Sequence, residues 1–333
     1  MAQTKKELVL KAMDAQPTER VPVGFWFHFL DDEIKADAFA DPSLTDKLLE
    51  GQLKYIDEHQ PDFVKIMTDG FFPYKNPTIK DAHSLEGLSG IKPLPGDAPW
   101  FARQVAYAKQ ITERYDGKLA FFYNLFCAGT ILKFMQPAFE DGEPFLAELV
   151  REHPAEAKRI LDVISGDVAR LAKRLITEAG VTGIYFSLQN LLGEGIDRKL
   201  YEEVLAPGEK AVLAAAQKVS DYNILHVCGY AGHHNDLTWY RDYPAKTINW
   251  AVVVEGIPLA EGRNIFDGRS ALGGFGNLDT SVLYSGTRAE VEAETKRILQ
   301  EAGRTGILLG ADCTVPRDIA WERFDWVRAA ANG

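Results

Sequence analysis

Short apolar runs alternate with longer segments of helical periodicity along most of the chain. Eight of these runs have the length and the β-branched or aromatic content of buried strands. They are Val21–Phe29, Phe63–Met67, Leu119–Phe126, Gly183–Gln189, Asn223–Gly229, Thr247–Val253, Ala271–Asn277 and Gly306–Cys313. Between them apolar residues recur at i, i+3 and i+4, as in Pro154–Glu178, which predicts amphipathic helices packed against the strands.

Near-continuous apolar strands that alternate with amphipathic helices are typical of a parallel sheet covered on both faces. Eight such units with no break in composition favour a closed barrel over an open doubly wound sheet. We therefore expect an α/β fold, a (β/α)₈ TIM barrel, in one domain over residues 1–333. An N-terminal helical extension is expected within residues 1–20, and a long rim loop over residues 68–99.

Composition and charge exclude several classes of protein. The chain has 48 acidic and 37 basic side chains, a formal net charge of −11, and no dense run of Lys and Arg, so neither nucleic acid nor a membrane surface is an expected partner. The longest apolar stretch, Leu119–Leu132, contains Asn124 and is too short to cross a bilayer. Three cysteines do not suggest a disulfide framework. We expect a soluble, cytoplasmic protein.

Candidate chemistry lies at the predicted carboxyl ends of strands, where TIM barrels carry their functional groups. Cys228 and Cys313 occupy two such ends, and His226 lies two residues before Cys228, so its side chain points to the same side of the strand. One imidazole and two thiolates are a typical zinc ligand set with a fourth position open. Buried cysteine is also common as a small apolar residue, as we interpret Cys127, so the residue types leave metal binding and packing equally open.

Other polar or aromatic residues near strand ends are candidates for substrate binding. They are Asn124, Tyr185, Gln189 and Asp312. Polar caps on strand ends are the alternative interpretation, and Asp312 could instead orient a metal ligand at its neighbour Cys313. Within the 68–99 loop, Phe71, Phe72 and Tyr74 suggest a lid or an exposed surface for docking a partner protein.

Motifs far apart along the chain point to one known family. They are Glu19–Val23, Pro61–Phe63, Thr68–Gly70 and Gly310–Pro316. Together they resemble the uroporphyrinogen decarboxylase superfamily, which includes cobalamin-dependent methyltransferases, and the resemblance covers nearly the whole chain. It implies a TIM barrel with helical N-terminal additions, in agreement with the periodicity.

Two chemistries compete within that superfamily. Decarboxylases carry an Arg-Gln-Ala-Gly-Arg loop after the first strand that binds a polycarboxylate substrate, whereas residues Phe27–Asp32 contain no arginine, and the net charge disfavours such a substrate. Gly310–Cys313 stands where decarboxylases have Gly-His-Gly near the last strand. Asp69 does occupy the place of the decarboxylase aspartate. A uroporphyrinogen decarboxylase-like lyase that acts on a carboxylated substrate, with Asp69 as its catalytic residue, is therefore the alternative.

The methyltransferase branch has a zinc signature of His-x-Cys and a distant Cys, which His226, Cys228 and Cys313 match. A glutamate after the sixth strand can be a fourth ligand there; Glu255 is a candidate, with a solvated loop glutamate as the alternative. The resemblance implies a zinc-dependent enzyme that moves a methyl group between a corrinoid and a thiol or similar small-molecule acceptor. It implies Zn²⁺ and methylcobalamin as cofactors and a corrinoid carrier protein as partner. The acceptor, the direction of transfer and a corrinoid- or metal-binding role without turnover stay open.

Overall fold

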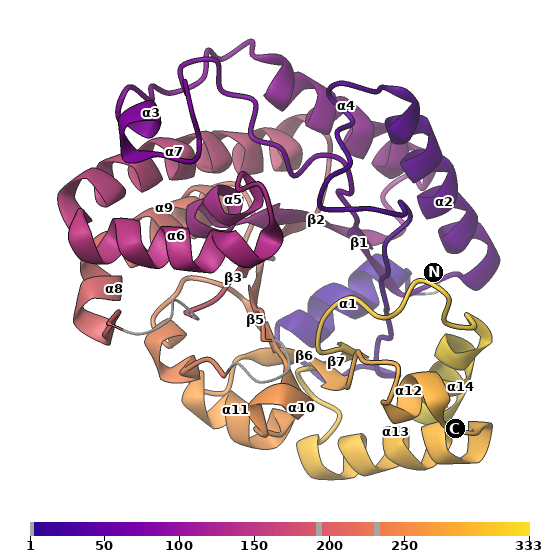
Figure 1. Cartoon of the computed structure of the whole chain (residues 1–333). Coiled ribbons are helices and arrows are strands. Elements are labelled where there is room, and N and C mark those ends of the chain that lie inside the picture. Colours follow the sequence, from indigo (N-terminus) through magenta and orange to yellow (C-terminus); the bar gives the residue numbers. More distant parts are fainter. Residues whose placement is uncertain (1–2, 191–194, 230–233) are drawn as a thin grey trace.

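The computed structural model describes residues 3–190, 195–229 and 234–333. In these ranges seven parallel strands form one curled sheet, in which each strand pairs with the next along the chain (Figure 1). The strands are β1 (Phe63–Ile66), β2 (Ala120–Phe126), β3 (Gly183–Leu188), β4 (Ile224–Val227), β5 (Thr247–Trp250), β6 (Ser270–Phe275) and β7 (Ile307–Ala311). Nearly all their residues are buried, which explains the unbroken apolar runs in the sequence.

The remaining predicted strand, Val21–Phe29, forms only isolated bridges. The Leu309 N–H donates to the carbonyl of Pro22 at 2.9 Å, and the Asp62 N–H donates to the carbonyl of Val23 at 3.0 Å, so the segment runs between β7 and the residue before β1. Pro22 has no N–H to donate, and the Val23 N–H donates to the Asp62 side chain at 2.9 Å. Seven regular strands and one extended segment between the two sheet edges thus replace the eight predicted strands.

Helices surround the sheet (Figure 1). They are α2 (Ser43–His59), α3 (Leu85–Ser89), α4 (Pro99–Arg114), α5 (Ala128–Phe134), α6 (Phe139–Glu152), α7 (Pro154–Glu178), α8 (Arg198–Val204), α9 (Ala206–Gln217), α10 (Val252–Glu255), α11 (Leu259–Ile265), α12 (Val282–Ser285), α13 (Arg288–Ala302) and α14 (Glu322–Asn332), with a 3₁₀ turn over Leu237–Tyr240. The stripe predicted on α7 is buried along its length, from Ile160 to Leu175. No helix in the described ranges is both long and apolar enough to cross a membrane.

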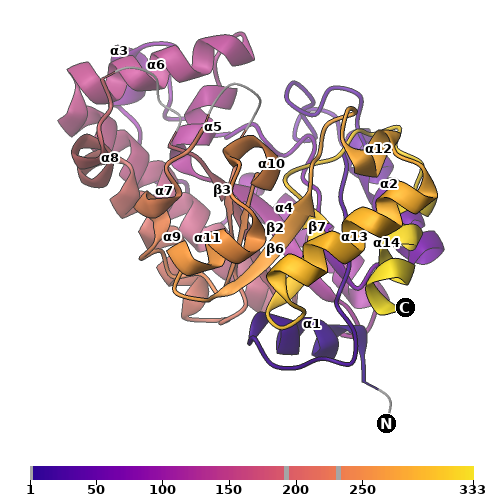
Figure 2. The same cartoon turned by 90° about the horizontal axis from the view of Figure 1, so that it is seen from below.

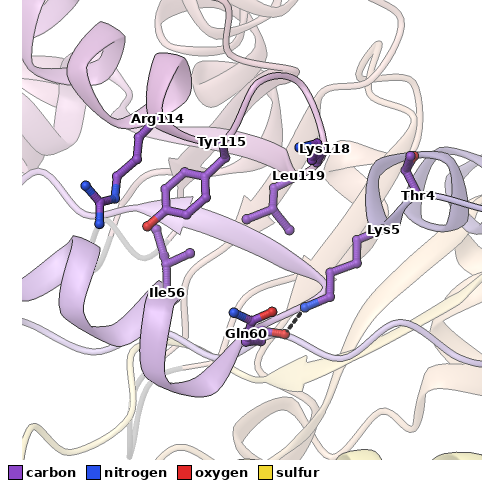
Figure 3. Close-up of a pocket in the computed structure, with 8 residues that line it drawn as sticks. All are labelled: Thr4, Lys5, Ile56, Gln60, Arg114, Tyr115, Lys118 and Leu119. Carbon is purple, nitrogen blue, oxygen red and sulfur yellow. Dashed lines mark hydrogen bonds between the residues drawn. The ribbon is translucent and has the colours of Figure 1, made fainter.

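The first helix, α1 (Lys5–Met13), lies across the amino ends of the strands, below the sheet in Figure 2. A capping box between Thr4 and Glu7 starts it, and its apolar face is buried. At this end a pocket of about 400 Å³ lies between α1, α2 and the end of α4 (Figure 3). The Lys5 ammonium in this pocket donates to the carbonyls of Gln60 and Pro61.

The segment between β1 and α4, which contains most of the predicted rim loop, is anchored to α7. The buried Asp167 carboxylate accepts from the Tyr74 hydroxyl at 2.5 Å and from the Leu94 N–H at 3.0 Å. Phe71, Phe72 and Tyr74 are all buried, with Phe71 packed on Phe39 and Tyr107 and Tyr74 on Trp100. The prediction of an exposed aromatic docking surface is therefore wrong, because these rings fold back into the core instead of facing solvent.

Candidate metal centre

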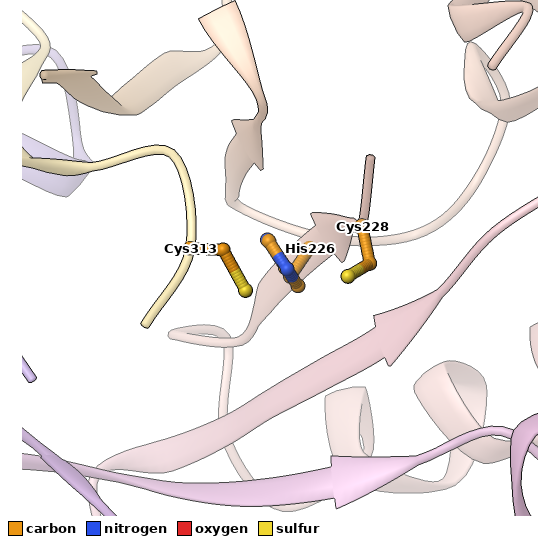
Figure 4. A group of neighbouring side chains, drawn as sticks. All are labelled: His226, Cys228 and Cys313. Carbon is orange, nitrogen blue, oxygen red and sulfur yellow. The ribbon is translucent and has the colours of Figure 1, made fainter. Parts of the chain in front are cut away.

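Strands β4 and β7 bring His226, Cys228 and Cys313 together at their carboxyl ends (Figure 4). His226 is in β4, Cys228 follows the end of that strand, and Cys313 lies just beyond β7. One nitrogen and two sulfur atoms of the three side chains all lie within 4.8 Å of one another, and no other potential metal-binding group of this kind occurs in the described part of the chain. Cys127 lies outside the group, buried, with its sulfur 3.3 Å from the Thr130 hydroxyl.

The orientation of the His226 ring is set by Asn249, its register partner in β5. The Asn249 amide nitrogen donates to the carbonyls of Leu272 at 2.8 Å and Ala311 at 3.3 Å, so its oxygen faces His226 Nδ1, 2.5 Å away. Because that oxygen can only accept, Nδ1 carries the proton and Nε2 keeps its lone pair.

His226 Nε2 is buried and has no hydrogen-bond partner among the described residues. A buried acceptor without a partner is costly, and here it belongs to the same group as two thiols. An imidazole with Nδ1 held by a neighbour and Nε2 free is the arrangement of a metal-binding histidine. The three side chains therefore fit a Zn²⁺ ion by both their donor types and their orphaned nitrogen.

Tyr185, a predicted substrate-binding residue, lies beside the imidazole. Its ring stacks on His226 with ring centroids 5.0 Å apart, and its hydroxyl donates to the Asn249 oxygen at 2.5 Å. Tyr185 thus supports the orientation of His226. Asn249 was missed by the sequence analysis, although an amide in the middle of the predicted strand Thr247–Val253 was a usable signal, because a buried amide needs partners.

The two thiols act on each other. A hydrogen bond from Cys228 to Cys313, aided by the nearby charge of Lys65, holds the pKa of the Cys313 thiol well below its usual range, and the same bond together with burial raises the pKa of the Cys228 thiol. The two thiols therefore lose their first proton readily, from Cys313, and retain the second on Cys228. Lys65 of β1 is a second residue that the sequence analysis missed; burial lowers the pKa of its ammonium to about 8.

Glu255, the predicted fourth ligand, is turned toward the Asn235 backbone and side chain. Its carboxylate accepts from the Asn235 N–H at 2.9 Å and from the Asn235 amide nitrogen at 2.8 Å. The same amide nitrogen donates to the Cys228 carbonyl at 3.0 Å, so Glu255 holds the chain after β4 in place. The structure does not bring Glu255 into the group of three, and its side chain is buried and not solvated.

The other residues predicted to bind substrate are Asp312, Asn124 and Gln189, and each makes different contacts. Asp312 accepts from the Val253 N–H at 2.7 Å at the start of α10, and burial raises the pKa of its carboxyl to about 8. The Asn124 amide donates to the Thr68 hydroxyl at 3.1 Å, while its oxygen is buried without a described partner. Gln189 makes no side-chain hydrogen bond to the described residues. Of these two residues, only Asn124 has a fully buried polar atom without a partner among the described residues.

The carboxylate of Asp69, the residue required by the decarboxylase alternative, is bound by the first rim segment, residues 28–33. One of its oxygens lies 2.8 Å from His28 Nδ1, and the other accepts from the N–H groups of Phe29 and Leu30 at 2.7 and 3.2 Å. The carboxylate is fully buried. These contacts assign Asp69 to holding residues 28–30 beside β1.

We expect the change Asp69→Asn to destabilise the protein by about 1–3 kcal/mol, because an amide nitrogen would face N–H donors that then lose their acceptor. Urea unfolding followed by circular dichroism measures this loss, and zinc analysis is expected to show unchanged metal content. Asp31→Asn is the matched control: Asp31 is an exposed carboxylate in the same rim segment, and its loss should change stability by less than about 1 kcal/mol. Loss of zinc in Asp69→Asn without a loss of stability would contradict this assignment.

Comparisons with known proteins agree with this architecture. A solved methyltransferase from Methanosarcina mazei matches with a TM-score of 0.74 and 14% identity over 99% of each chain. A B12-independent methionine synthase from Shewanella sp. W3-18-1 matches with a TM-score of 0.53 and 12% identity, over 92% of this chain and 93% of that one. At these identities the likeness establishes the fold alone. No curated protein sequence matches the chain.

A comparison with protein families gives a match over nearly the whole chain. The model of the family described as "Uroporphyrinogen decarboxylase (URO-D)" matches residues 4–333. The match includes all seven strands of the sheet and the three residues of the candidate metal centre. The chain therefore belongs to the uroporphyrinogen decarboxylase family.

Proposed function

We propose that this protein is a zinc-dependent methyltransferase that moves a methyl group between a corrinoid and a thiol. The observation that carries the proposal is the buried, unpartnered Nε2 of His226 in one group with two thiols. Membership of a family that includes corrinoid methyltransferases supports it, and so does the engagement of Asp69 in hydrogen bonds to His28, Phe29 and Leu30.

His226, Cys228 and Cys313 would hold the metal. Bound there, Zn²⁺ would keep a sulfur ligand in its thiolate form at neutral pH and hold it at the barrel mouth. The protein's own groups prepare this centre: Asn249 and Tyr185 hold the imidazole in the tautomer that leaves Nε2 free, and Cys228 shares its proton with Cys313. Glu255 and Asn235 hold the chain that carries Cys228.

A corrinoid would supply the methyl group and keep the electron pair of the bond that held it. The acceptor sulfur would take up the methyl group and give its proton to solvent. What the protein contributes is position, because a nucleophile held in line with the methyl group avoids most of the entropy cost of a bimolecular encounter. We also propose that a corrinoid carrier protein is the natural methyl donor.

The test uses zinc-replete protein and methylcobalamin with three acceptors: 2-mercaptoethanesulfonate, homocysteine and tetrahydrofolate. We expect the absorbance of methylcobalamin to change and a methylated thiol to be detected by mass spectrometry. Cys127→Ser, which alters the one cysteine outside the group, should retain this activity, whereas Cys313→Ser should lose it. Binding of methylcobalamin without any methylated product would instead support the role without turnover. Transfer to tetrahydrofolate alone would overturn the thiol assignment.

A further inference from the structure

Lys65 is a buried cation without a partner of opposite charge. It is the only charged residue of β1, its exposure is 6%, and its ammonium group makes no hydrogen bond or ion pair with a described residue. Its ammonium lies 4.2 Å from the centroid of the Tyr185 ring and 5.3 Å from that of Trp26. These ring contacts offset part of the cost of burying an ammonium group.

Three acidic groups lie close enough to act on the Lys65 ammonium. Burial lowers the pKa of this ammonium, and the charges of Cys313, Cys228 and Asp69 raise it in part. Asp69 is already bound to His28 and to two backbone N–H groups. The Tyr185 ring, which the ammonium contacts, also stacks on His226. Lys65 therefore lies beside the candidate metal centre, separated from the His226 imidazole by the Tyr185 ring.

Counting charges at that centre shows what Lys65 can balance. Two thiolates and a neutral imidazole carry two negative charges, and a divalent metal ion cancels them. The metal and its three ligands then leave the charge of Lys65 unbalanced, and the nearby Asp69 carboxylate is bound by His28 and two backbone N–H groups. A neutral fourth ligand would leave the lysine charge uncompensated, whereas an anionic ligand such as a thiolate would cancel it in a site of low dielectric constant, where this attraction is strong.

We propose that Lys65 is the countercharge for the substrate and makes the centre selective for an acceptor that binds as an anion, in this case a thiol bound as its thiolate. This inference rests on the proposed function and specifies its acceptor class. Lys65 acts here through its charge, as a specificity-determining residue. The rival role is retention of the metal, in which its charge would only stabilise the two cysteine thiolates.

The test compares an anionic with a neutral ligand on the same metal. Protein loaded with Co²⁺ is titrated with 2-mercaptoethanol, which binds metals as a thiolate, and separately with imidazole, which binds as a neutral molecule. Sulfur-to-cobalt charge-transfer absorption reports each added thiolate. The variants are Lys65→Met, which removes the charge, and Lys65→Arg, which keeps it. Lys118→Met, an exposed lysine at the opposite end of the sheet, is the control.

We expect Lys65→Met to bind 2-mercaptoethanol about 10–100-fold more weakly than the wild type, with unchanged imidazole affinity and unchanged Co²⁺ content. Lys65→Arg should recover most of the thiol affinity. An equal loss for both ligands, no loss for the thiol, or loss of Co²⁺ from Lys65→Met would overturn the inference. If Lys65→Met does not fold, Lys65→Gln replaces it, since its polar head group suits the same site without the charge.

The same titration separates this inference from the proposed function. Wild-type protein that binds Co²⁺ but adds no thiolate at any 2-mercaptoethanol concentration would refute both. Wild-type protein that adds a thiolate with the same affinity as Lys65→Met would refute only the role of Lys65 and leave the metal centre and its thiol ligand in place.

Discussion

Replacing Cys228 and Cys313 together by serine is expected to lower the zinc content from about one ion per chain to none. Two of the three protein ligands are lost, and a serine hydroxyl stays protonated at neutral pH where a cysteine sulfur coordinates as the thiolate. Elemental analysis of freshly purified protein measures the ratio. Methyl transfer to thiols is expected to disappear with the metal, because no activated sulfur would remain at the barrel mouth.

Two controls make this result specific. Cys127→Ser changes a buried cysteine outside the group and should keep its zinc. Thermal unfolding of the double variant shows whether its fold survives, and we expect it to, since seven strands and their helices form the core without a metal. Wild-type protein that holds no zinc even after reconstitution would remove thiolate activation from the proposed function and direct attention to carboxylate substrates and folate acceptors.

The strands were predictable because both faces of this sheet are buried. Each of the seven regular strands begins within one residue of a predicted apolar run, and four of the runs extend two or three residues past the end of their strand. The segment Val21–Phe29 has the same composition but not the same hydrogen bonds, since Pro22 has no N–H and Asp62 binds the Val23 N–H with its side chain. Apolar patterning reports burial, and burial does not require a regular hydrogen-bond ladder.

Aromatic composition was a poor guide to the segment between β1 and α4. The sequence shows Phe71, Phe72 and Tyr74 in a region without regular periodicity, and nothing local tells which way they point. Each is buried by a residue far away in the sequence: Asp167 holds Tyr74 against α7, Phe71 packs on Tyr107, and Phe72 packs on Phe126 and Phe134. Long-range anchors of this kind cannot be inferred from a local pattern.

Some residues of the candidate metal centre could be predicted from local sequence patterns, and others could not. His226, Cys228 and Cys313 were predictable because strand alternation and strand ends are local properties. The position of Glu255 was not, because it depends on the path of the chain after β5 and on its contact with Asn235. Lys65 lies in an apolar run and Asn249 in another, and a polar residue in a doubly buried strand is itself a signal of function or of a buried network.

Asn249→Ala is expected to weaken zinc binding about 10–100-fold while the protein stays folded. The amide oxygen holds the proton of His226 on Nδ1 and fixes the ring, and without it the imidazole can rotate or change its tautomer so that Nε2 no longer presents its lone pair. Competition with a chromophoric chelator measures the zinc affinity, and circular dichroism monitors the fold.

Tyr185→Phe is the matched comparison, because it removes the other donor to the same oxygen but retains the stacked ring and the bond from His226. Its zinc affinity should fall by less than that of Asn249→Ala. Equal losses in the two variants would assign the effect to general packing of the barrel interior, and unchanged affinity in Asn249→Ala would mean that the two sulfurs and the strand backbone suffice to direct the imidazole. Only the graded result fits a centre whose histidine is oriented by one amide oxygen.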